Sequence, residues 1–310
     1  MSLRIGIVGL PNVGKSTLFN ALTKSGIEAE NYPFCTIDPN VGIVEVPDSR
    51  LQKIDSLINT EKIVKTTIEF VDIAGLVKGA SQGEGLGNKF LSNIRNVDAI
   101  IHVVRCYENE NVTHVEGNIN PQRDIEIIET ELILKDIETV TNRIEKIKRE
   151  VKAGRKIEEN NLLESILHHL NNGKILNQLN IQHELMKELN LLTDKPVLFV
   201  INIAENDINN NPSVLLSELE SYLSNRNENY LNICSALEQE ISSLDEDEQT
   251  EYLKEFNLAE PVLNQLIRTA YTMLSLHTFF TAGPKEIRAW TIKINDTAYD
   301  AAGKIHTDFQ

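Results

Sequence analysis

Apolar residues follow two different spacings along the first hundred positions. Short continuous runs at residues 3–9, 41–46 and 99–104 have the length of buried strands, whereas residues 18–23 and 87–95 repeat apolar side chains at helical spacing. Strands that alternate with helices are typical of an α/β fold built on a parallel sheet. The pattern therefore predicts an α/β domain in the N-terminal part of the chain.

The alternation stops between residues 119 and 194. This block contains long charged stretches with Ile and Leu at helical spacing, and it has no strand signal. Ala153 and Gly154 interrupt the helical pattern, and a glycine flanked by charged residues suits the tip of a helical hairpin, although Gly173 offers another break. The α/β pattern resumes at residue 195. We therefore predict a helical hairpin inserted into one α/β domain.

The last segment, residues 276–310, contains strand-like runs joined by Ala282-Gly283-Pro284. A segment of about 35 residues is too short to bury an independent hydrophobic core without a metal, a disulfide or a partner. We therefore expect an incomplete domain at this end of the chain.

Composition limits the possible partners. The 310 residues include 30 Lys and Arg against 46 Asp and Glu, a formal net charge of −16, so contact with nucleic acid requires a local basic patch and DNA binding is not expected. No apolar run approaches the roughly 20 residues of a membrane helix, and the N-terminus does not resemble a signal peptide. Three widely spaced cysteines suggest neither disulfides nor a zinc site. We predict a cytoplasmic protein without membrane contact.

Residues 9–16 read Gly-Leu-Pro-Asn-Val-Gly-Lys-Ser and match the phosphate-binding pattern G-x-x-x-x-G-K-[ST] between a strand and a helix. Consecutive N–H groups of such a loop surround phosphate oxygens at the positive end of a helix dipole. Lys15 is expected to reach the β and γ phosphates, and Ser16 to give its hydroxyl to Mg²⁺. The nucleotide-binding residues expected here are Asn12, Val13, Gly14, Lys15, Ser16 and Thr17.

Two downstream elements indicate a switch that depends on a triphosphate. Asp72 and Gly75 form a D-x-x-G pattern at the end of an apolar strand, so Asp72 can hold the magnesium shell while the Gly75 amide meets the γ phosphate. Thr36 lies in a turn-rich stretch before the strand at 41–46, from which it can close on the metal; without the phosphate loop it would be read as a surface threonine. The expected metal ligands are Ser16, Thr36 and Asp72.

The base pocket is expected after the apolar run at residues 197–201. Guanine-specific domains carry N-K-x-D there, because aspartate accepts hydrogen bonds from guanine N1–H and the 2-amino group together, but this chain has Ile203 and Glu205 in place of the lysine and the aspartate. Losing this contact removes about 1 to 3 kcal/mol of guanine preference per unpaired group. We predict relaxed or adenine-favouring selectivity; the alternative is a tolerant GTPase in which Glu205 reaches the base. The expected base contacts are Asn202, Ile203, Glu205, Ser235 and Ala236.

Taken together, these motifs resemble those of the YchF-type Obg-like ATPases. The resemblance implies a G-domain-like P-loop NTPase of three α/β layers, with an inserted helical hairpin and a C-terminal β-grasp fragment like the start of a TGS domain. The motifs that carry it are residues 9–16, 32–40, 46–51, 72–77, 79–88, 202–205, 279–284 and 288–291. The expected division is residues 1–118 and 195–275 for the two parts of the NTPase domain, 119–194 for the hairpin and 276–310 for the partial TGS-like domain.

Hydrolysis is expected to be slow. Leu76 follows the D-x-x-G glycine, where many related GTPases carry a glutamine that orients water. His114 occupies a polar loop at a position that resembles a histidine implicated in hydrolysis in this family, and the alternative is a solvated loop histidine. Asn12 can help to hold K⁺ near the phosphates, and the alternative is a turn-forming asparagine. The candidate catalytic residues are His114, Lys15, Gly75 and Asn12.

Basic residues gather near the expected hairpin tip, where they outnumber Glu145 and Glu150. The family resemblance implies ribosome association, so we predict salt-sensitive binding of the ribosome or ribosomal RNA at this tip, with a merely solvated helix as the alternative. The basic residues are Arg143, Lys146, Lys148, Arg149, Lys152, Arg155 and Lys156.

The function expected from these features is that of a Mg²⁺-dependent ATPase. It binds ATP in preference to GTP, hydrolyses it slowly to ADP and phosphate, and acts as a ribosome-associated switch. The alternative is a GTPase or dual-specificity binding module whose nucleotide state controls partner binding with negligible turnover.

Overall fold

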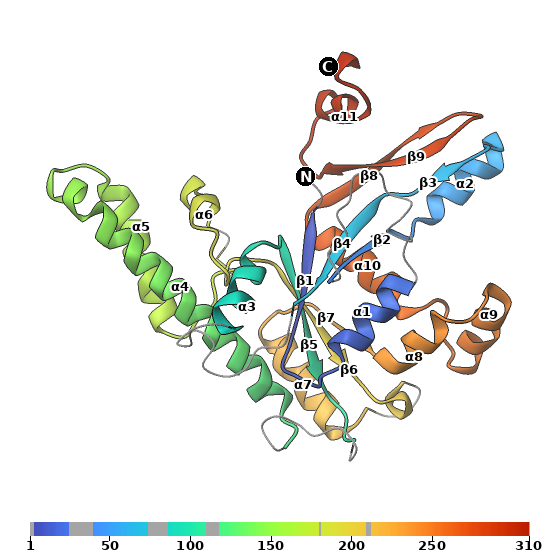
Figure 1. Ribbon diagram of the computed structural model, residues 1–310, viewed down its shortest axis with the longest axis horizontal. Coiled ribbons are helices and arrows are strands. Elements are labelled where there is room, and N and C mark those ends of the chain that lie inside the picture. The colour runs from blue at the N-terminus through green and yellow to red at the C-terminus, as the bar shows by residue number, and fades with distance from the viewer. Residues whose placement is uncertain are drawn as a thin grey trace.

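The computed structural model describes residues 3–24, 40–73, 86–109, 118–179, 181–208 and 212–309. A six-stranded sheet forms its centre, in the order β2-β4-β1-β5-β6-β7 (Figure 1). Only β2 runs antiparallel to its neighbour, and the other pairs are parallel. The strands are β1 (Arg4–Val8), β2 (Val41–Glu45), β4 (Thr67–Asp72), β5 (Ala99–Arg105), β6 (Val197–Asn202) and β7 (Tyr230–Ile233).

Helices cover both faces of this sheet. All seven residues of β5 are buried, which requires cover on both sides and explains why its sequence is mostly apolar rather than alternating, with His102 and Arg105 as the exceptions. The predicted α/β fold is therefore confirmed. The helices of this part are α1 (Lys15–Lys24), α2 (Ser49–Ile58), α3 (Leu86–Arg95), α7 (Val214–Asn225), α8 (Ser235–Ile241), α9 (Glu246–Glu255) and α10 (Val262–Met273).

The helical hairpin projects from the sheet as two long antiparallel helices (Figure 1). Helix α4 (Pro121–Lys152) begins with Asn120 as N-cap and a proline in its first turn, and α5 (Ile157–Asn171) returns along it. The turn between them contains Gly154 at φ 77°, and Gly173 ends α5 instead. The predicted tip at Gly154 is thus confirmed. The short helix α6 (Glu184–Leu189) that follows was not predicted.

A buried carboxylate anchors the base of the hairpin. Asp136 of α4 is fully buried and accepts three hydrogen bonds, from the Leu192 N–H at 2.9 Å, the Thr193 N–H at 2.8 Å and the Thr193 hydroxyl at 2.7 Å. Burial raises the pKa of Asp136, and these hydrogen bonds oppose that rise. The outgoing helix is thereby fastened to the chain segment that leads back into β6.

The C-terminal residues form a second, smaller sheet. Strands β8 (Leu276–Ala282) and β9 (Ile287–Lys293) make an antiparallel hairpin, and the two-residue strand β3 (Ile63–Val64) adds to β9 in parallel. Ile287 and Ala289 share a small core with Leu51 of α2, so this segment packs on residues from the first part of the chain. Helix α11 (Ala298–Ile305) follows and contains no buried residue. Among the described helices, none is long and apolar enough to span a membrane.

Candidate nucleotide-binding site

The phosphate loop joins β1 to α1 at the carboxyl edge of the sheet. Gly14 has φ 98°, and a Cβ there would lie 2.2 Å from Nδ2 of Asn202, so no larger residue fits this position. Asn12 adopts φ 63°, a left-handed conformation that asparagine tolerates better than most residues. The predicted strand, loop and helix are therefore present with the backbone that a phosphate cradle requires.

Lys15 is the buried cation of this loop. Its side chain is only 7% exposed, and Nζ donates a hydrogen bond of 2.7 Å to the carbonyl of Leu10. Burial lowers the pKa of Lys15 to about 8, while the nearby Asp72 carboxylate opposes that shift. An ammonium group carries three N–H donors, so donors remain for phosphate oxygens.

Ser16 and Asp72 form a pair of oxygen ligands beside Lys15. Ser16 Oγ lies 3.5 Å from Asp72 Oδ2, and the other carboxylate oxygen of Asp72 is buried without a hydrogen-bond partner. Burial raises the pKa of Asp72, and Lys15 and the Ser16 hydroxyl oppose the rise. Hydroxyl and carboxylate oxygens suit Mg²⁺, which takes its remaining ligands from phosphate and water. The described residues therefore fit the predicted magnesium site.

Asn202 ties the phosphate loop to the start of α8. It is 3% exposed; Nδ2 donates to the Val13 carbonyl at 2.9 Å, and Oδ1 accepts from the Ser235 N–H at 3.0 Å. The hydroxyl of Ser235 is buried without a partner near Gly14. The structure thus brings together three of the predicted contact regions: the phosphate loop, the end of β6 and the start of α8.

The other expected base contacts differ in their exposure. Ile203 is buried in the core between β6, α7 and α8, whereas Glu205 begins an exposed 3₁₀ turn and Ala236 is exposed on α8. Glu205 and Ala236 therefore remain open to a ligand, while Ile203 contributes mainly to packing.

Three of the predicted residues, Thr36, Gly75 and His114, lie outside the described residues, as does Leu76. Among the residues that are described, no group of three or more His, Cys, Asp or Glu side chains is arranged to hold a metal ion. The magnesium ligands expected here are accordingly a mixture of hydroxyl, carboxylate and phosphate oxygens.

Arg105 is a residue that the sequence reasoning missed. It ends β5 with only 1% of its surface exposed, and it donates to the carbonyls of Tyr107 at 3.1 Å and Asn109 at 3.3 Å. Its guanidinium also lies 4.8 Å from the ring centroid of Tyr107. Arg105 therefore fixes the chain segment that leads toward residue 114. A single charge at the end of an apolar run was the only signal in the sequence.

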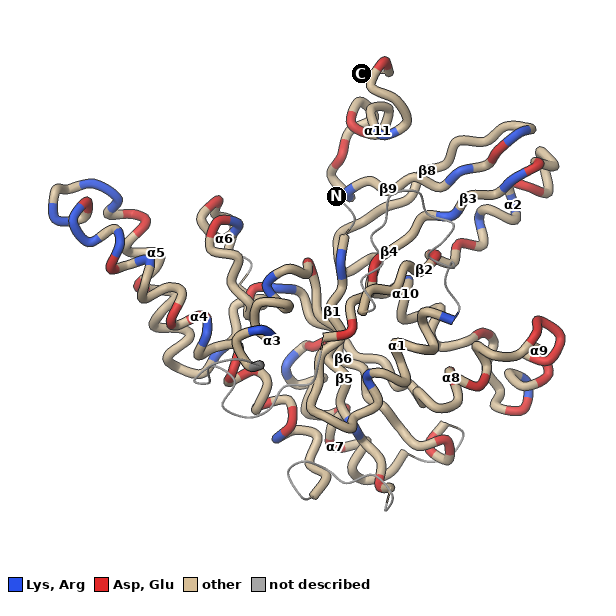
Figure 2. Tube along the Cα trace, viewed as in Figure 1, with Lys and Arg blue, Asp and Glu red and all other residues tan. Residues whose placement is uncertain are grey.

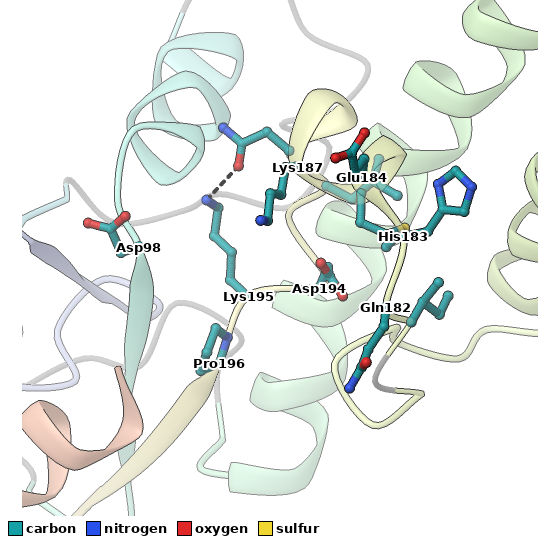
Figure 3. A pocket seen from close by; sticks show the side chains of 12 residues that line it. Asp98, Gln182, His183, Glu184, Lys187, Asp194, Lys195 and Pro196 are labelled. Carbon is teal, nitrogen blue, oxygen red and sulfur yellow. Dashed lines mark hydrogen bonds between the residues drawn. The ribbon is translucent and has the colours of Figure 1, made fainter. Parts of the chain in front are cut away.

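A separate pocket of about 620 Å³ lies at the amino ends of β5 and β6, beside α6 (Figure 3). Lys195 lines this pocket, but its Nζ already donates to the carbonyls of Arg95 and Val97 and to Oδ1 of Asn190. This pocket is at the opposite edge of the sheet from the phosphate loop, so it is not part of the nucleotide site.

Comparison with known proteins gives one consistent picture. Residues 4–143 match a family model described as "50S ribosome-binding GTPase", and residues 276–310 match the C-terminal model of YchF GTPases, described as a protein of unknown function. The proteins named "Ribosome-binding ATPase YchF" from Escherichia coli O157:H7 and Bacillus subtilis are each 49% identical over 100% of this chain and 86% of their own length. The solved structure of the Schizosaccharomyces pombe YchF GTPase is 38% identical, with a TM-score of 0.87 over 99% of this chain and 85% of that one.

Proposed function

The chain belongs to the YchF family of P-loop NTPases, and from this membership and the site geometry we propose that it is a Mg²⁺-dependent ATPase that prefers ATP to GTP. In this proposal Lys15 binds the β and γ phosphates, and Ser16, Thr36 and Asp72 hold the magnesium ion. When bound, Mg²⁺ neutralises the charge that develops on the phosphate oxygens during phosphoryl transfer. The buried, unpartnered oxygen of Asp72 supports this assignment.

The observation that carries the preference for ATP is the segment that follows β6. Ile203 stands where guanine-specific domains have a lysine, and its side chain packs into the core. Glu205 stands in place of the aspartate, in an exposed turn. Guanine needs an acceptor pair at its N1–H and 2-amino group, whereas adenine does not. The site therefore carries no strong preference for guanine.

We propose that turnover is slow, because Leu76 cannot orient a water molecule. His114, the Gly75 amide and a K⁺ ion held by Asn12 remain predicted contributors. Hydrolysis of ATP by the purified chain with Mg²⁺ tests this part, with Lys15→Ala as the control that removes the phosphate contact. Turnover that is slow and lost in Lys15→Ala is the expected result, and equal rates in both proteins would contradict it.

The roles of His114 and Asn12 need separate variants. We expect single-turnover hydrolysis to fall in His114→Ala with either K⁺ or Na⁺. In Asn12→Ala we expect the difference between K⁺ and Na⁺ to disappear. Unchanged rates in both variants would remove both residues from the mechanism.

The second part of the proposal is ribosome binding through the hairpin tip, and hence a cytoplasmic site of action. Figure 2 shows Lys and Arg gathered at the tip of a chain that is acidic overall. Three of the tip cations are paired within the hairpin: Arg143 with Glu159 and Glu188, Lys148 with Glu145, and Lys156 with Glu150 and Glu159. The remaining tip cations are exposed and form no ion pair with any described residue: Lys146, Arg149, Lys152 and Arg155.

This distribution defines the test of ribosome binding. We expect the variant Arg149→Glu/Lys152→Glu/Arg155→Glu to lose co-sedimentation with ribosomes, because it reverses cations that have no internal partner. The matched control reverses three exposed lysines outside the hairpin, Lys53, Lys254 and Lys285. Equal co-sedimentation of the two variants would remove the tip from the proposed contact.

Leu76 also favours a second candidate function, a switch whose nucleotide state controls partner binding. A turnover assay with and without ribosomes separates the two. Appreciable hydrolysis by the protein alone supports an enzyme, whereas hydrolysis that requires ribosomes supports the switch.

A further inference from the structure

An open groove of about 340 Å³ runs along the side of the hairpin, between α4, α6 and the end of α3. We call it the flank groove. It is remote from the phosphate loop, because α3 ends at Arg95, just before the chain enters the amino end of β5. The residues that line it are Arg95, Lys135, Glu138, Thr139, Asn142, Arg143, Lys146, Glu188 and Leu189.

The flank groove is cationic on a protein that is acidic overall. It holds four cations and two carboxylates, and the carboxylates are already engaged: Glu138 with Lys135 at 2.7 Å and Glu188 with Arg143 at 3.0 Å. Lys146 is exposed and forms no ion pair with any described residue. Two cations of the groove, Arg95 and Lys146, therefore have no carboxylate bound to them within the described chain.

Arg95 is held in place without being neutralised. Its Nη2 donates to the Thr139 hydroxyl at 3.1 Å. The buried Asp136 attracts Arg95 electrostatically, but the oxygens of that carboxylate are occupied by the N–H groups of Leu192 and Thr193. A guanidinium carries five N–H donors in a planar fork, so Arg95 retains donors that can reach a phosphate in the groove.

The groove continues the cationic surface of the tip. Lys135, Asn142, Lys146 and Arg149 recur along α4 at spacings of seven, four and three residues, which places them on one face of the helix. At 1.5 Å per residue, this face extends over roughly 20 Å. One extended polyanion can therefore contact the tip and the flank groove together.

We propose that the flank groove binds a backbone phosphate of RNA, with Arg95 and Lys146 as its ligands. This inference rests on the proposed ribosome binding and extends the RNA contact from the tip to the base of the hairpin. RNA is favoured over an acidic protein because Leu189 is the one apolar side chain that lines the groove, whereas protein interfaces depend on buried apolar anchors. Contacts from Arg and Lys to phosphate position an RNA without reading its sequence.

A phosphate on Arg95 also contacts the helix that follows the D-x-x-G segment in the chain. The carbonyl of Arg95 accepts hydrogen bonds from Lys195 Nζ at 3.3 Å and Asn190 Nδ2 at 3.0 Å. The end of α3 is thus held by Thr139 on α4 and by Asn190 and Lys195 of the segment that returns to β6. RNA in the groove would therefore act on α3 as well as on the hairpin.

The test compares Arg95→Gln/Lys146→Gln with a control that neutralises two exposed lysines outside both the groove and the tip, Lys174→Gln/Lys254→Gln. The probes are purified ribosomes and protein-free ribosomal RNA, titrated over a range of KCl concentrations. Loss of a phosphate contact lowers the slope of log affinity against log salt by about 0.7 to 0.9. We expect the groove variant to lose about twice that slope on both probes, and the control to keep the slope of the unmodified chain.

Several outcomes would overturn the proposal. If the groove variant keeps the full slope while the tip variant loses ribosome binding, the groove is not a phosphate site and the proposed function stands. If neither variant changes the slope, the proposed ribosome contact fails as well. Loss of ribosome binding with unchanged binding to bare RNA would identify a protein partner instead. Lys146→Glu alone, at an exposed position, gives the same test should Arg95→Gln disturb folding.

Discussion

The side-chain amide of Asn202 donates a hydrogen bond of 2.9 Å to the main-chain carbonyl of Val13, across 189 positions of sequence. The same amide accepts from the Ser235 N–H at 3.0 Å. One buried residue therefore positions the phosphate loop and the start of α8 relative to each other. We expect the spacing between the predicted phosphate and base subsites to depend on this contact.

Replacing Asn202 with alanine should impair both stability and nucleotide binding. The change leaves a buried carbonyl and a buried N–H without partners, which costs about 1 to 3 kcal/mol for each group. We expect a lower free energy of unfolding in urea and weaker binding of ATP analogues. Asn225→Ala, at an exposed position on α7, is the control. Equal ATP affinity in the Asn202 and Asn225 variants would contradict the positioning role.

ATP binding should be accompanied by proton uptake near pH 8. The pKa of Lys15 in the free protein is lowered to about 8 by burial, and the triphosphate charge will raise it in the complex. Lys15 loses its proton as the pH rises through about 8, so we expect ATP affinity to fall over that range and proton uptake to reach about half a proton at pH 8. Calorimetry at pH 7 and pH 8 in buffers of different ionisation enthalpy measures this uptake, and uptake that does not increase with pH would contradict the assignment.

The stability of the base of the hairpin should depend on Asp136. Asp136→Ala leaves the Leu192 and Thr193 N–H groups buried without their acceptor, so we expect a loss of about 2 to 5 kcal/mol in the free energy of unfolding. Hydrogen exchange at these two amides should accelerate. Glu138→Ala removes an exposed carboxylate from the same helix and should change stability by less than about 1 kcal/mol. Similar losses in the two variants would refute the anchor.

His102 should make the protein sensitive to acid. Burial lowers its pKa to about 3 in the folded chain, compared with about 6.5 in an unfolded chain. The unfolded state therefore binds one proton more between these values, and stability falls as the pH drops from about 6.5, by up to about 1.4 kcal/mol per pH unit. Urea unfolding at several pH values should show a shallower acid dependence for His102→Gln. Identical slopes would show that His102 is not the titrating group.

The sequence pattern predicted those elements whose residues lie next to one another in the chain. The phosphate loop follows from a strand, a glycine loop and a helix adjacent in sequence, and the tip at Gly154 follows from one break in a charged helical pattern. Strand β3 was not predicted, because two residues form a strand only by pairing with β9, more than 200 positions away.

The contacts that Asn202 and Arg105 make were also not predicted. The motif placed Asn202 in the base pocket, but its contact with Val13 depends on the folded sheet, which brings β6 beside the phosphate loop. Arg105 binds carbonyls of the segment that follows it, a geometry that its sequence neighbours do not reveal. Thr36, Gly75 and His114 remain predictions from the sequence.

We expect the segment that follows β6 to accept adenine at least as well as guanine. Calorimetric titration of the purified chain with non-hydrolysable ATP and GTP analogues, in the presence of Mg²⁺, measures this preference directly. We expect the ATP analogue to bind at least as tightly as the GTP analogue. Tight binding of the GTP analogue alone, or binding of neither, would contradict it.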